Sequence, residues 1–600
     1  MPFDALARTS LQSISGLTEV KNENGEVVAT AVEWLVQVFD NPDAYYGKAA
    51  DYKIFRIEHD QLLGVLELPR RPGFYRYSLK EILRNGRKLE EEFAKSEKKR
   101  EEGKALDLYD AKLEEISRKQ QQFARLVRTP PERAGGNVVR PIPPQSPNGD
   151  WEALATIDLR AAETLSEQEQ VDLHESARKA IWEKYERQFG DLSRMPEPGR
   201  KMIERETEQK LRFDLLQEGR SRREKVSPAA ATFTAILDSA RRDKGEFNAK
   251  FLETYQSEFL AHVSDEDKFK NRLEAKWLGQ FAPFYHCEYL YLPMVIFTLV
   301  SWIVWMRPLL RAAFWLGLFA FAVHTLALIL RMYVQGRPPV TNLYASAVFI
   351  GWGAVGLALL LEWYYKNGVG SLVAGTVGAA TLQLAHFLGG SGDTMAMLVA
   401  VLDTNFWLAT HVTTVTLGYT ATLVAGMIAV VYIIRGVGTT TLDDATAKSL
   451  GQMMYGVICF ATLLSFVGTV LGGIWADYSW GRFWGWDPKE NGAVLIVIWN
   501  ALILHARWGG MIKVRGMAVL ALFGNMVTAW SWFGTNQLGI GLHAYGFDNR
   551  LAAGCRWFWL SQLALMGVGM IPRQYWRSQP GKVAAAPAIE QVQEKGKKKR

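Results

Sequence analysis

Cysteine is almost missing from this chain of 600 residues, which contains only Cys287, Cys459 and Cys555 and no CxxC pair. This scarcity leaves disulfide frameworks, zinc ribbons and covalent haem attachment to a CxxCH of its own without support. The N-terminus has no basic segment followed by an apolar core, so it is not a signal peptide. The net charge is only +7, which does not indicate nucleic acid as a partner.

Long apolar runs are missing from the first half of the chain and dominate the second. Residues 1–285 hold no run that could cross a bilayer, whereas residues 289–571 are a series of such runs. The sequence therefore predicts a mainly α-helical protein, in which a soluble and largely helical region precedes a polytopic region in the lipid bilayer. We expect nine spans, at approximately 289–306, 310–331, 343–363, 369–388, 411–434, 453–474, 491–508, 517–534 and 555–571.

Changes in composition predict the domain boundaries. Short β-like or mixed segments occur at 52–57 and 62–68, and a charged helical pattern covers 78–127. Ser166 and Glu169 have the spacing of a helix-capping box. We find no catalytic constellation before residue 286. The predicted divisions are a soluble region at 1–128, mixed and then helical; a proline-rich linker at 129–150; a helical soluble region at 151–285; a membrane domain at 286–575; and a basic tail at 576–600.

Basic residues in the loops predict the orientation. They occupy alternate short loops and the tail, so one side is consistently positive and is expected to be cytoplasmic. Residues 1–285 and the loops at 389–410, 475–490 and 535–554 are then outside. Because no export signal precedes 1–285, we expect a missing export element, either an upstream segment or a misplaced start. The basic loop residues are Arg307, Arg311, Lys366, Arg435, Lys513 and Arg515, and the exceptions, outside by this count, are Arg331 and Arg337.

Residues 475–490, which we call the tryptophan segment, combine many rings with several acids. Trp475, Trp480, Trp484 and Trp486 lie beside Asp477, Asp487 and Glu490, between two apolar helical runs. Carboxylates are very costly in hydrocarbon, so the segment belongs at a membrane–water boundary. An aromatic belt is the alternative, but a belt needs only one or two rings per helix end and no Gly and Pro to shape it. The composition suits a large planar ligand with apolar faces and a charged rim.

Two histidines are predicted at the depth of the tryptophan segment. His411 is at the outer mouth of the fifth span, and His543 lies in the last outer loop. Neutral imidazole is the usual ligand of haem iron, and two imidazoles on opposite sides give a six-coordinate iron. A single histidine here is more often an interfacial residue, but two that flank one aromatic segment favour a haem site.

His505 must lie at another depth. It follows Asp487 by 18 residues, which in a straight helix at about 1.5 Å per residue places it near the inner face. It cannot share an iron with His411 or His543, and His324 also lies too far away. A partner ligand for His505 is therefore expected on another chain. His386 is expected to be a packing or loop residue.

These residues together resemble a known family. The run from Trp480 to Glu490, Trp-Gly-Arg-Phe-Trp-Gly-Trp-Asp-Pro-Lys-Glu, resembles the WWD haem-handling motif. The surroundings of His411, His505 and His543, and the segment from His324 to Arg331 followed by Pro339-Val-Thr-Asn-Leu-Tyr, are also similar to those of CcsA, also called ResC. This family supplies the membrane subunit of the system II cytochrome c synthase. The resemblance covers roughly residues 289–571.

The resemblance implies a role, a substrate and partners. His411 and His543 would ligate an outward-facing haem b beneath a shelf formed by Trp475, Trp480, Trp484, Trp486 and Asp487. His505 would ligate a second haem on the route across the bacterial inner membrane, with a histidine of a CcsB (ResB)-like membrane protein. The synthase (haem lyase) joins haem vinyl groups to the CxxCH of apocytochrome c.

Two other functions are compatible with parts of this pattern. A haem transporter or chaperone would use the same outer site and leave thioether formation to another protein, and system I haem-handling proteins carry the same type of motif. A b-type haem electron carrier using quinone would need histidine pairs at two depths, and the inner partner for such a pair is missing from the sequence.

Overall fold

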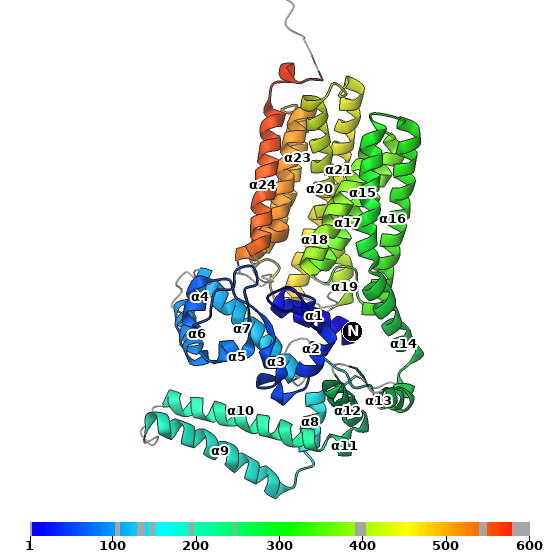
Figure 1. The fold of residues 1–600 in the computed structure, drawn as a ribbon. Coiled ribbons are helices and arrows are strands. Elements are labelled where there is room, and N and C mark those ends of the chain that lie inside the picture. Colours follow the sequence, from blue (N-terminus) through cyan, green and yellow to red (C-terminus); the bar gives the residue numbers. More distant parts are fainter. Residues whose placement is uncertain are drawn as a thin grey trace, which may run out of the picture. The chain divides into compact units, whose positions relative to one another are not determined.

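The computed structural model describes residues 3–101, 108–128, 139–144, 151–190, 197–243, 246–247, 249–389, 404–538 and 549–578. The chain forms two compact units, one from residues up to Lys276 and one from Trp277 onward. Both are mainly α-helical, as the sequence predicts (Figure 1).

The first unit combines two short antiparallel sheets with helices around one apolar core. Strand β1 pairs with β2, and β3 with β4. Fully buried rings at its centre include Trp34, Phe39, Phe55, Tyr77 and Phe123. Its elements are α1 (Phe3–Ser15), β1 (Glu19–Lys21), β2 (Val27–Thr30), α2 (Ala31–Val38), α3 (Lys48–Asp51), β3 (Lys53–Arg56), α4 (Asp60–Val65), β4 (Arg76–Ser78), α5 (Leu79–Leu83), α6 (Gly86–Glu101), α7 (Leu108–Val127), α8 (Leu154–Ala162), α9 (Glu167–Phe189), α10 (Glu197–Ser221), α11 (Arg223–Val226), α12 (Pro228–Arg242), α13 (Ala249–Thr254) and α14 (Asp265–Arg272).

Local patterns in this unit are confirmed except at one place. Strand β3 lies within 52–57, and Ser166 caps α9 in a capping box with Glu169. The β-like interpretation of 62–68 is wrong, because α4 covers most of it. Leu62, Leu63 and Leu66 are buried there at helical spacing, so one helical face meets the core.

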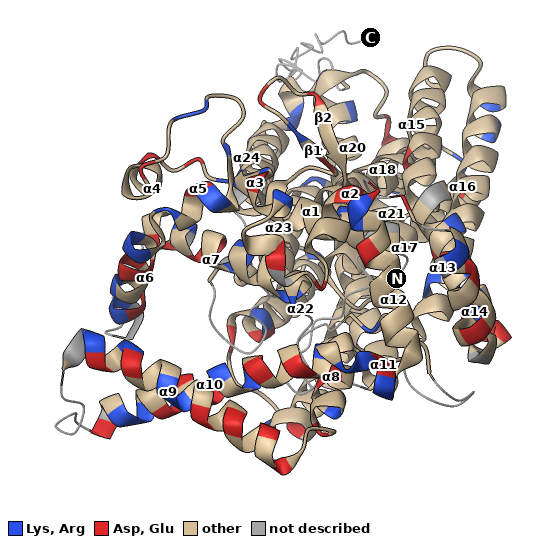
Figure 2. Ribbon diagram, turned by 60° about the horizontal axis from the view of Figure 1, so that its bottom comes forward, with Lys and Arg blue, Asp and Glu red and all other residues tan. Residues whose placement is uncertain are grey.

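Charged side chains crowd the long helices of this unit. They cover α6, α9 and α10 in Figure 2, whereas the helices of the second unit are almost entirely uncharged. Helices α9 and α10 share only a small apolar contact, made by Tyr185 and Ile203 with Ile181. Most of their remaining surface is exposed, as expected for helices with such alternating charge, except where α10 packs on α8 and Gly219 lies against the Asp158 backbone.

One buried ion network joins three segments of the soluble unit. The Arg223 guanidinium, 3% exposed, donates to Asp158 and to Asp40 (Arg223 Nη1 to Asp40 Oδ2, 2.7 Å). Burial of the guanidinium opposes its charge, but the bonds to both carboxylates outweigh this and raise the pKa of Arg223. The two carboxylates come from residues just after α2 and from α8, so this network ties distant parts of the chain together.

The second unit is an up-and-down helical bundle. Neighbouring pairs include α15 with α16 and α18, α17 with α18, α20 with α21 and α23, and α21 with α22. Its elements are α15 (Pro283–Ser301), α16 (Met306–Gln335), α17 (Leu343–Tyr365), α18 (Val369–Gly389), α19 (Asn405–Trp407), a π-helical turn (Leu408–Val412), α20 (Thr413–Gly438), α21 (Asp444–Trp480), α22 (Pro488–Trp508), α23 (Val514–Ala529), a second π-helical turn (Trp530–Gly534) and α24 (Asn549–Met570).

Seven described segments of this bundle are long and apolar enough to cross a membrane, so the protein is a multi-pass membrane protein. The first and last of the nine expected spans coincide with α15 and α24, which are helical but fall outside the seven. Polar residues in their opening turns, such as Glu288 and Arg556, lower their mean hydropathy. The seven are Met306–Gln335, Leu343–Tyr365, Val369–Leu388, Asn405–Gly438, Asp444–Trp480, Pro488–Trp508 and Val514–Gly534.

The connections between the helices distinguish the two ends of the bundle. The links after α15, α17, α20 and α22 lie at the end where α24 finishes, and these are the predicted basic loops (Figure 1). The tryptophan segment and the start of α15 lie at the other end. Arg331, an exception in the loop count, is 1% exposed and donates to the Pro339 carbonyl and the Thr341 hydroxyl. Its guanidinium group is therefore buried and hydrogen-bonded inside the fold.

We predict that Arg223→Met destabilises the soluble unit by about 3–5 kcal/mol, because it leaves two buried carboxylates without their cation. The measurement is hydrogen exchange of α8 and α12 in the full chain under increasing urea. Arg187→Met is the matched control, since Arg187 is 81% exposed in its pair with Glu183 and should change stability by less than about 1 kcal/mol. Equal effects of the two substitutions would contradict the prediction.

Candidate functional site

A cavity of about 240 Å³ lies at the end of the bundle that carries the tryptophan segment. Residues 340–350, the π-helical turn before α20, the C-terminal part of α21 and the start of α22 surround it. His411, Trp475, Trp480 and Trp484 are among its lining residues. Four of the predicted site residues, spread over 74 positions of the sequence, are therefore brought together around one space.

His411 is held by a backbone carbonyl. Its Nδ1 lies 2.8 Å from the carbonyl oxygen of Gly468 on α21. Because a carbonyl only accepts, Nδ1 must carry the proton, and in the neutral ring Nε2 is then the nitrogen with a lone pair. The ring lies edge-on to Trp475, with 5.8 Å between centroids. This tautomer is the one required of a metal ligand that binds through Nε2.

Small residues on α21 make this hydrogen bond possible. Gly468 faces Val415 of α20, where an added Cβ would lie 2.7 Å from the Val415 Cα. One turn later, a Cβ on Gly472 would lie 2.5 Å from His411 Cε1, and one on Gly473 would lie 2.5 Å from Phe483 Cζ. Close helix approach through small residues is the usual packing mode in membranes. The glycines therefore set the position of the imidazole.

The carboxylates of the tryptophan segment fold it. Asp487 caps α22: its Oδ1 accepts from the N–H groups of Lys489 and Glu490, both at 3.0 Å. Glu490 returns the bond, since its Oε2 accepts from the N–H groups of Asp487 and Gly485 at 3.3 and 2.7 Å. The sequence analysis assigns Asp487 to the shelf that would contact haem. In the structure, its carboxylate forms this capping box with Glu490.

The four tryptophans differ in exposure. Trp475 is 8% exposed, whereas Trp486 is 72% exposed and has a left-handed backbone, with φ of 58°. Trp484 lies edge-on to Trp486, with 6.0 Å between centroids. The indole Nε1 atoms of Trp475 and Trp484 are buried and have no acceptor among the described residues. Trp475, Trp480 and Trp484 thus line the cavity, and Trp486 lies outside its lining.

Among the described histidines of the bundle, only His411 lines the cavity. His505 is in the last turn of α22, at the opposite end from Asp487, and is exposed; its Nδ1 lies 2.8 Å from the Ala501 carbonyl oxygen. His324 is buried, with Nδ1 3.1 Å from the Tyr291 hydroxyl. His386 pairs with Glu288 at 2.9 Å, which agrees with a packing role. His543 lies outside the described residues.

Sequence reasoning did not single out several other residues of the cavity. The Lys489 ammonium donates to the carbonyl oxygen of Trp532 at 2.9 Å, and the Tyr419 hydroxyl lies 2.5 Å from that of Ser531. Trp532 and Ser531 belong to the second π-helical turn, as His411 belongs to the first. Such turns are frequent at functional sites but leave no pattern in a single sequence. Lys489 was visible within the tryptophan segment, next to the two acids.

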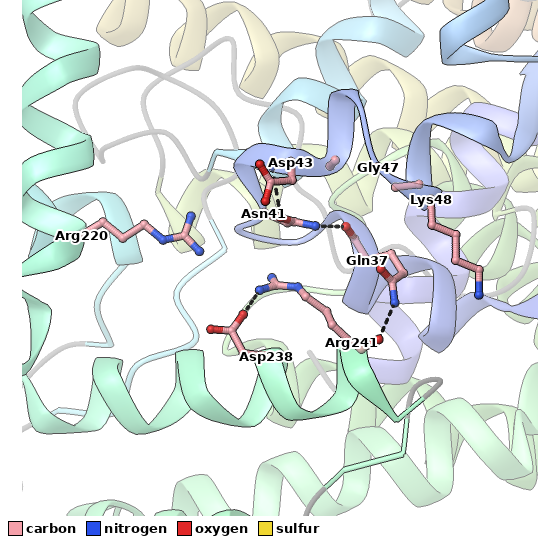
Figure 3. Close-up of a pocket in the computed structure, with 10 residues that line it drawn as sticks. Gln37, Asn41, Asp43, Gly47, Lys48, Arg220, Asp238 and Arg241 are labelled. Atoms are coloured by element: carbon pink, nitrogen blue, oxygen red, sulfur yellow. Dashed lines mark hydrogen bonds and ion pairs between the residues drawn. The ribbon is translucent and has the colours of Figure 1, made fainter.

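A second cavity, of about 460 Å³, lies within the soluble unit (Figure 3). The arginines that line it form hydrogen bonds and ion pairs within the unit. Arg241 pairs with Asp238 and donates to the carbonyls of Val36 and Phe39, and Arg220 donates to that of Asp40 at 2.7 Å. These are carbonyls at the end of α2, which helix geometry leaves without partners. Among the described residues, no group of three His, Cys, Asp or Glu could hold a metal ion.

We predict that Gly472→Ala destabilises the bundle by about 1–3 kcal/mol, because the new methyl group overlaps the His411 ring. Gly456→Ala is the matched control on the same helix, since nothing lies within 4 Å of its added Cβ. That change should be neutral or stabilising by up to about 1 kcal/mol through helix propensity. Thermal unfolding of the detergent-solubilised proteins measures both, and shifts of the same sign and size would contradict the prediction.

Comparison with known proteins agrees with this site. The family model described as cytochrome c assembly protein matches residues 340–543, which include the cavity and extend to His543. The chain is 32% identical over 238 residues to protein NrfI of Wolinella succinogenes, covering 38% of this chain but only 26% of NrfI. It is 29% identical over 231 residues to the cytochrome c biogenesis protein CcsA of Chlamydomonas reinhardtii, covering 37% of this chain and 65% of that protein.

A cyanobacterial relative is covered more completely. The chain is 30% identical over 252 residues to the cytochrome c biogenesis protein CcsA of Synechococcus sp. strain CC9902, covering 37% of this chain and 83% of that protein. Most of that relative is thus represented within one part of the present chain. The match, together with the family model and the site, shows that this multi-pass membrane protein belongs to the CcsA family of cytochrome c biogenesis proteins.

Proposed function

We propose that this protein carries haem across the membrane, holds it at the outer end of the bundle and presents its vinyl groups to the CxxCH of apocytochrome c. It would act as the CcsA-type subunit of a cytochrome c synthase. The observation that carries the proposal is the imidazole of His411, fixed in one tautomer by Gly468 at the wall of a tryptophan-lined cavity. Haem is the substrate in this scheme and is bound as haem b before thioethers form.

The residues present suit an iron porphyrin. Imidazole with Nδ1 bonded to a carbonyl is the usual state of a haem ligand, and Trp475, Trp480 and Trp484 offer apolar faces for the ring. The indole N–H groups of Trp475 and Trp484, buried and without acceptors among the described residues, support a ligand with polar groups at its rim as well as an apolar face. We propose His543 as the second axial ligand.

A porphyrin is larger than this cavity, so part of the ring must extend beyond it. That requirement fits presentation to a second protein, which needs the reacting edge to be accessible. Trp486, which is 72% exposed and directly precedes the capping residue Asp487, would supply surface next to the exposed edge. Positioning of the reactants gives most of the rate in such a reaction.

The chemistry asked of the site is an addition without net redox change. Each cysteine S–H adds across one vinyl C=C bond: sulfur bonds the carbon next to the ring, and hydrogen goes to the terminal carbon, which becomes a methyl group. The chain's own residues bind and orient the substrate, and two imidazoles keep the iron six-coordinate until the apocytochrome histidine displaces one of them.

His505 is proposed as a ligand for haem in transit at the inner end. Its ring is exposed on the bundle surface, where Trp508 lies 5.5 Å away between centroids. Its Nδ1 also faces a carbonyl, so Nε2 is again the lone-pair nitrogen. A ligand on the outer surface of a bundle needs its counterpart from another chain, which supports a CcsB-like partner.

We predict that purified wild-type protein shows the absorption spectrum of six-coordinate haem with two imidazole ligands. His411→Ala and His543→Ala should each lose the outer haem or leave it five-coordinate, and His505→Ala should lose only the inner haem. His386→Ala is the control, because that histidine pairs with Glu288 and should leave the spectra unchanged. Unaltered haem content and spectra in all three ligand variants would refute the site.

A reporter experiment separates synthesis from transport. Coexpression with a CcsB-like partner and an exported CxxCH reporter should give covalently bound haem in the reporter, and a reporter with AxxAH should give none. His411→Ala should reduce product formation at least about tenfold, since ligation at the outer site sets the geometry. Haem that reaches the outer side without covalent product would instead indicate a transporter or chaperone.

A further inference from the structure

Charge is distributed unevenly around the tryptophan-lined cavity. Among the described residues that line it, Lys489 is the single Lys or Arg and Glu490 the single carboxylate. Glu490 is engaged by its own segment: its Oε2 accepts from two backbone N–H groups, and its buried Oε1, without a hydrogen-bond partner among the described residues, lies 3.8 Å from Arg482 Nη1 in an ion pair. Lys489 therefore supplies the positive charge among the described residues that line the cavity.

Lys489 is only partly satisfied within the fold. An ammonium has three donors, and the one hydrogen bond of Lys489 Nζ within the described part of the chain goes to the Trp532 carbonyl oxygen. None of the described carboxylates forms an ion pair with it; Asp487 acts on it electrostatically, while Asp487 Oδ1 accepts from backbone N–H groups. A partly buried cation bonded only to a neutral carbonyl favours an anionic ligand.

Two tryptophans that line the same space carry further donors. The Nε1 atoms of Trp475 and Trp484 are buried and have no acceptor among the described residues. Trp475 as a whole is 8% exposed, so its N–H cannot be satisfied by bulk water. One ammonium and two indole N–H groups thus offer hydrogen bonds that the described protein atoms do not use.

We propose that Lys489 binds a carboxylate side chain of the porphyrin held at His411, with the indole N–H groups of Trp475 and Trp484 as additional donors. This inference rests on the proposed function and names the part of the substrate that the cavity recognises. Haem carries its two propionates on one edge and its two vinyl groups toward the opposite edge. Lys489 would therefore select porphyrin dicarboxylates and fix the rotation of the ring, so that the vinyl edge is directed outward.

The test compares haem with its dimethyl ester, which has the same ring and iron but no carboxylate charge. Both are titrated into the detergent-solubilised full chain, and binding is followed in the Soret band. The wild type should bind the diacid about tenfold more tightly than the diester, as expected for one charge-assisted contact. Lys489→Met should abolish this preference by weakening diacid binding alone, and Lys489→Arg should retain most of it.

Controls separate a direct contact from a structural effect. Lys513→Met removes a lysine from the link between α22 and α23, at the other end of the bundle, and should behave as wild type. Diester binding by Lys489→Met should equal that of the wild type, which shows that the cavity is intact. An unchanged diacid preference in Lys489→Met, or equal weakening of both ligands, would overturn the proposal.

The outcome is distinguishable from failure of the haem site itself. If His411→Ala binds both porphyrins as well as the wild type, or the wild type binds neither, the proposed function fails whatever Lys489 does. If binding requires His411 but the preference does not require Lys489, only the present inference fails.

Discussion

The site depends on the close approach of α20 and α21. Gly468 lets the two helices meet with almost no side chain between them, and the same residue supplies the carbonyl that orients His411. In a bilayer the hydrophobic effect does not draw helices together, so close van der Waals packing between small residues has to do so. The stability of the bundle and the orientation of the imidazole therefore share one contact, and a larger side chain at that contact would disturb both.

The acids next to the tryptophans illustrate how a charged motif can be part of the fold. Carboxylates are rare at membrane depth and suggest function by default. Here Asp487 and Glu490 first satisfy backbone N–H groups at the start of α22, so their charge stabilises a helix N-terminus and a turn. The motif thus folds around its own acids, and the lysine between them lines the cavity together with three of the tryptophans.

Much of the architecture could be predicted from composition and periodicity. The division into a charged helical part and an apolar bundle, the alternating basic loops and the separate depth of His505 follow from span length and helix rise. The exposure of Trp486 could not be predicted, because it depends on a left-handed backbone at that residue. The burial of Arg331 could not be predicted either. Counting basic residues in loops assumes that each arginine marks the cytoplasmic side, whereas Arg331 is buried and donates hydrogen bonds to Pro339 and Thr341. The hydrogen-bond partner of Lys489 lies 43 positions away, within a π-helical turn that has no sequence pattern.

The two π-helical turns, Leu408–Val412 and Trp530–Gly534, change the angular phase of their helices beside the cavity. Each additional residue advances an α-helix by about 100°, and a π turn absorbs such an advance locally. Along one continuous helix, the residues that pack in the bundle and the residues that face the cavity can therefore be oriented independently. Deleting a residue within either turn would restore a regular helix and rotate the cavity-facing side chains away, while the membrane-embedded packing stayed in register.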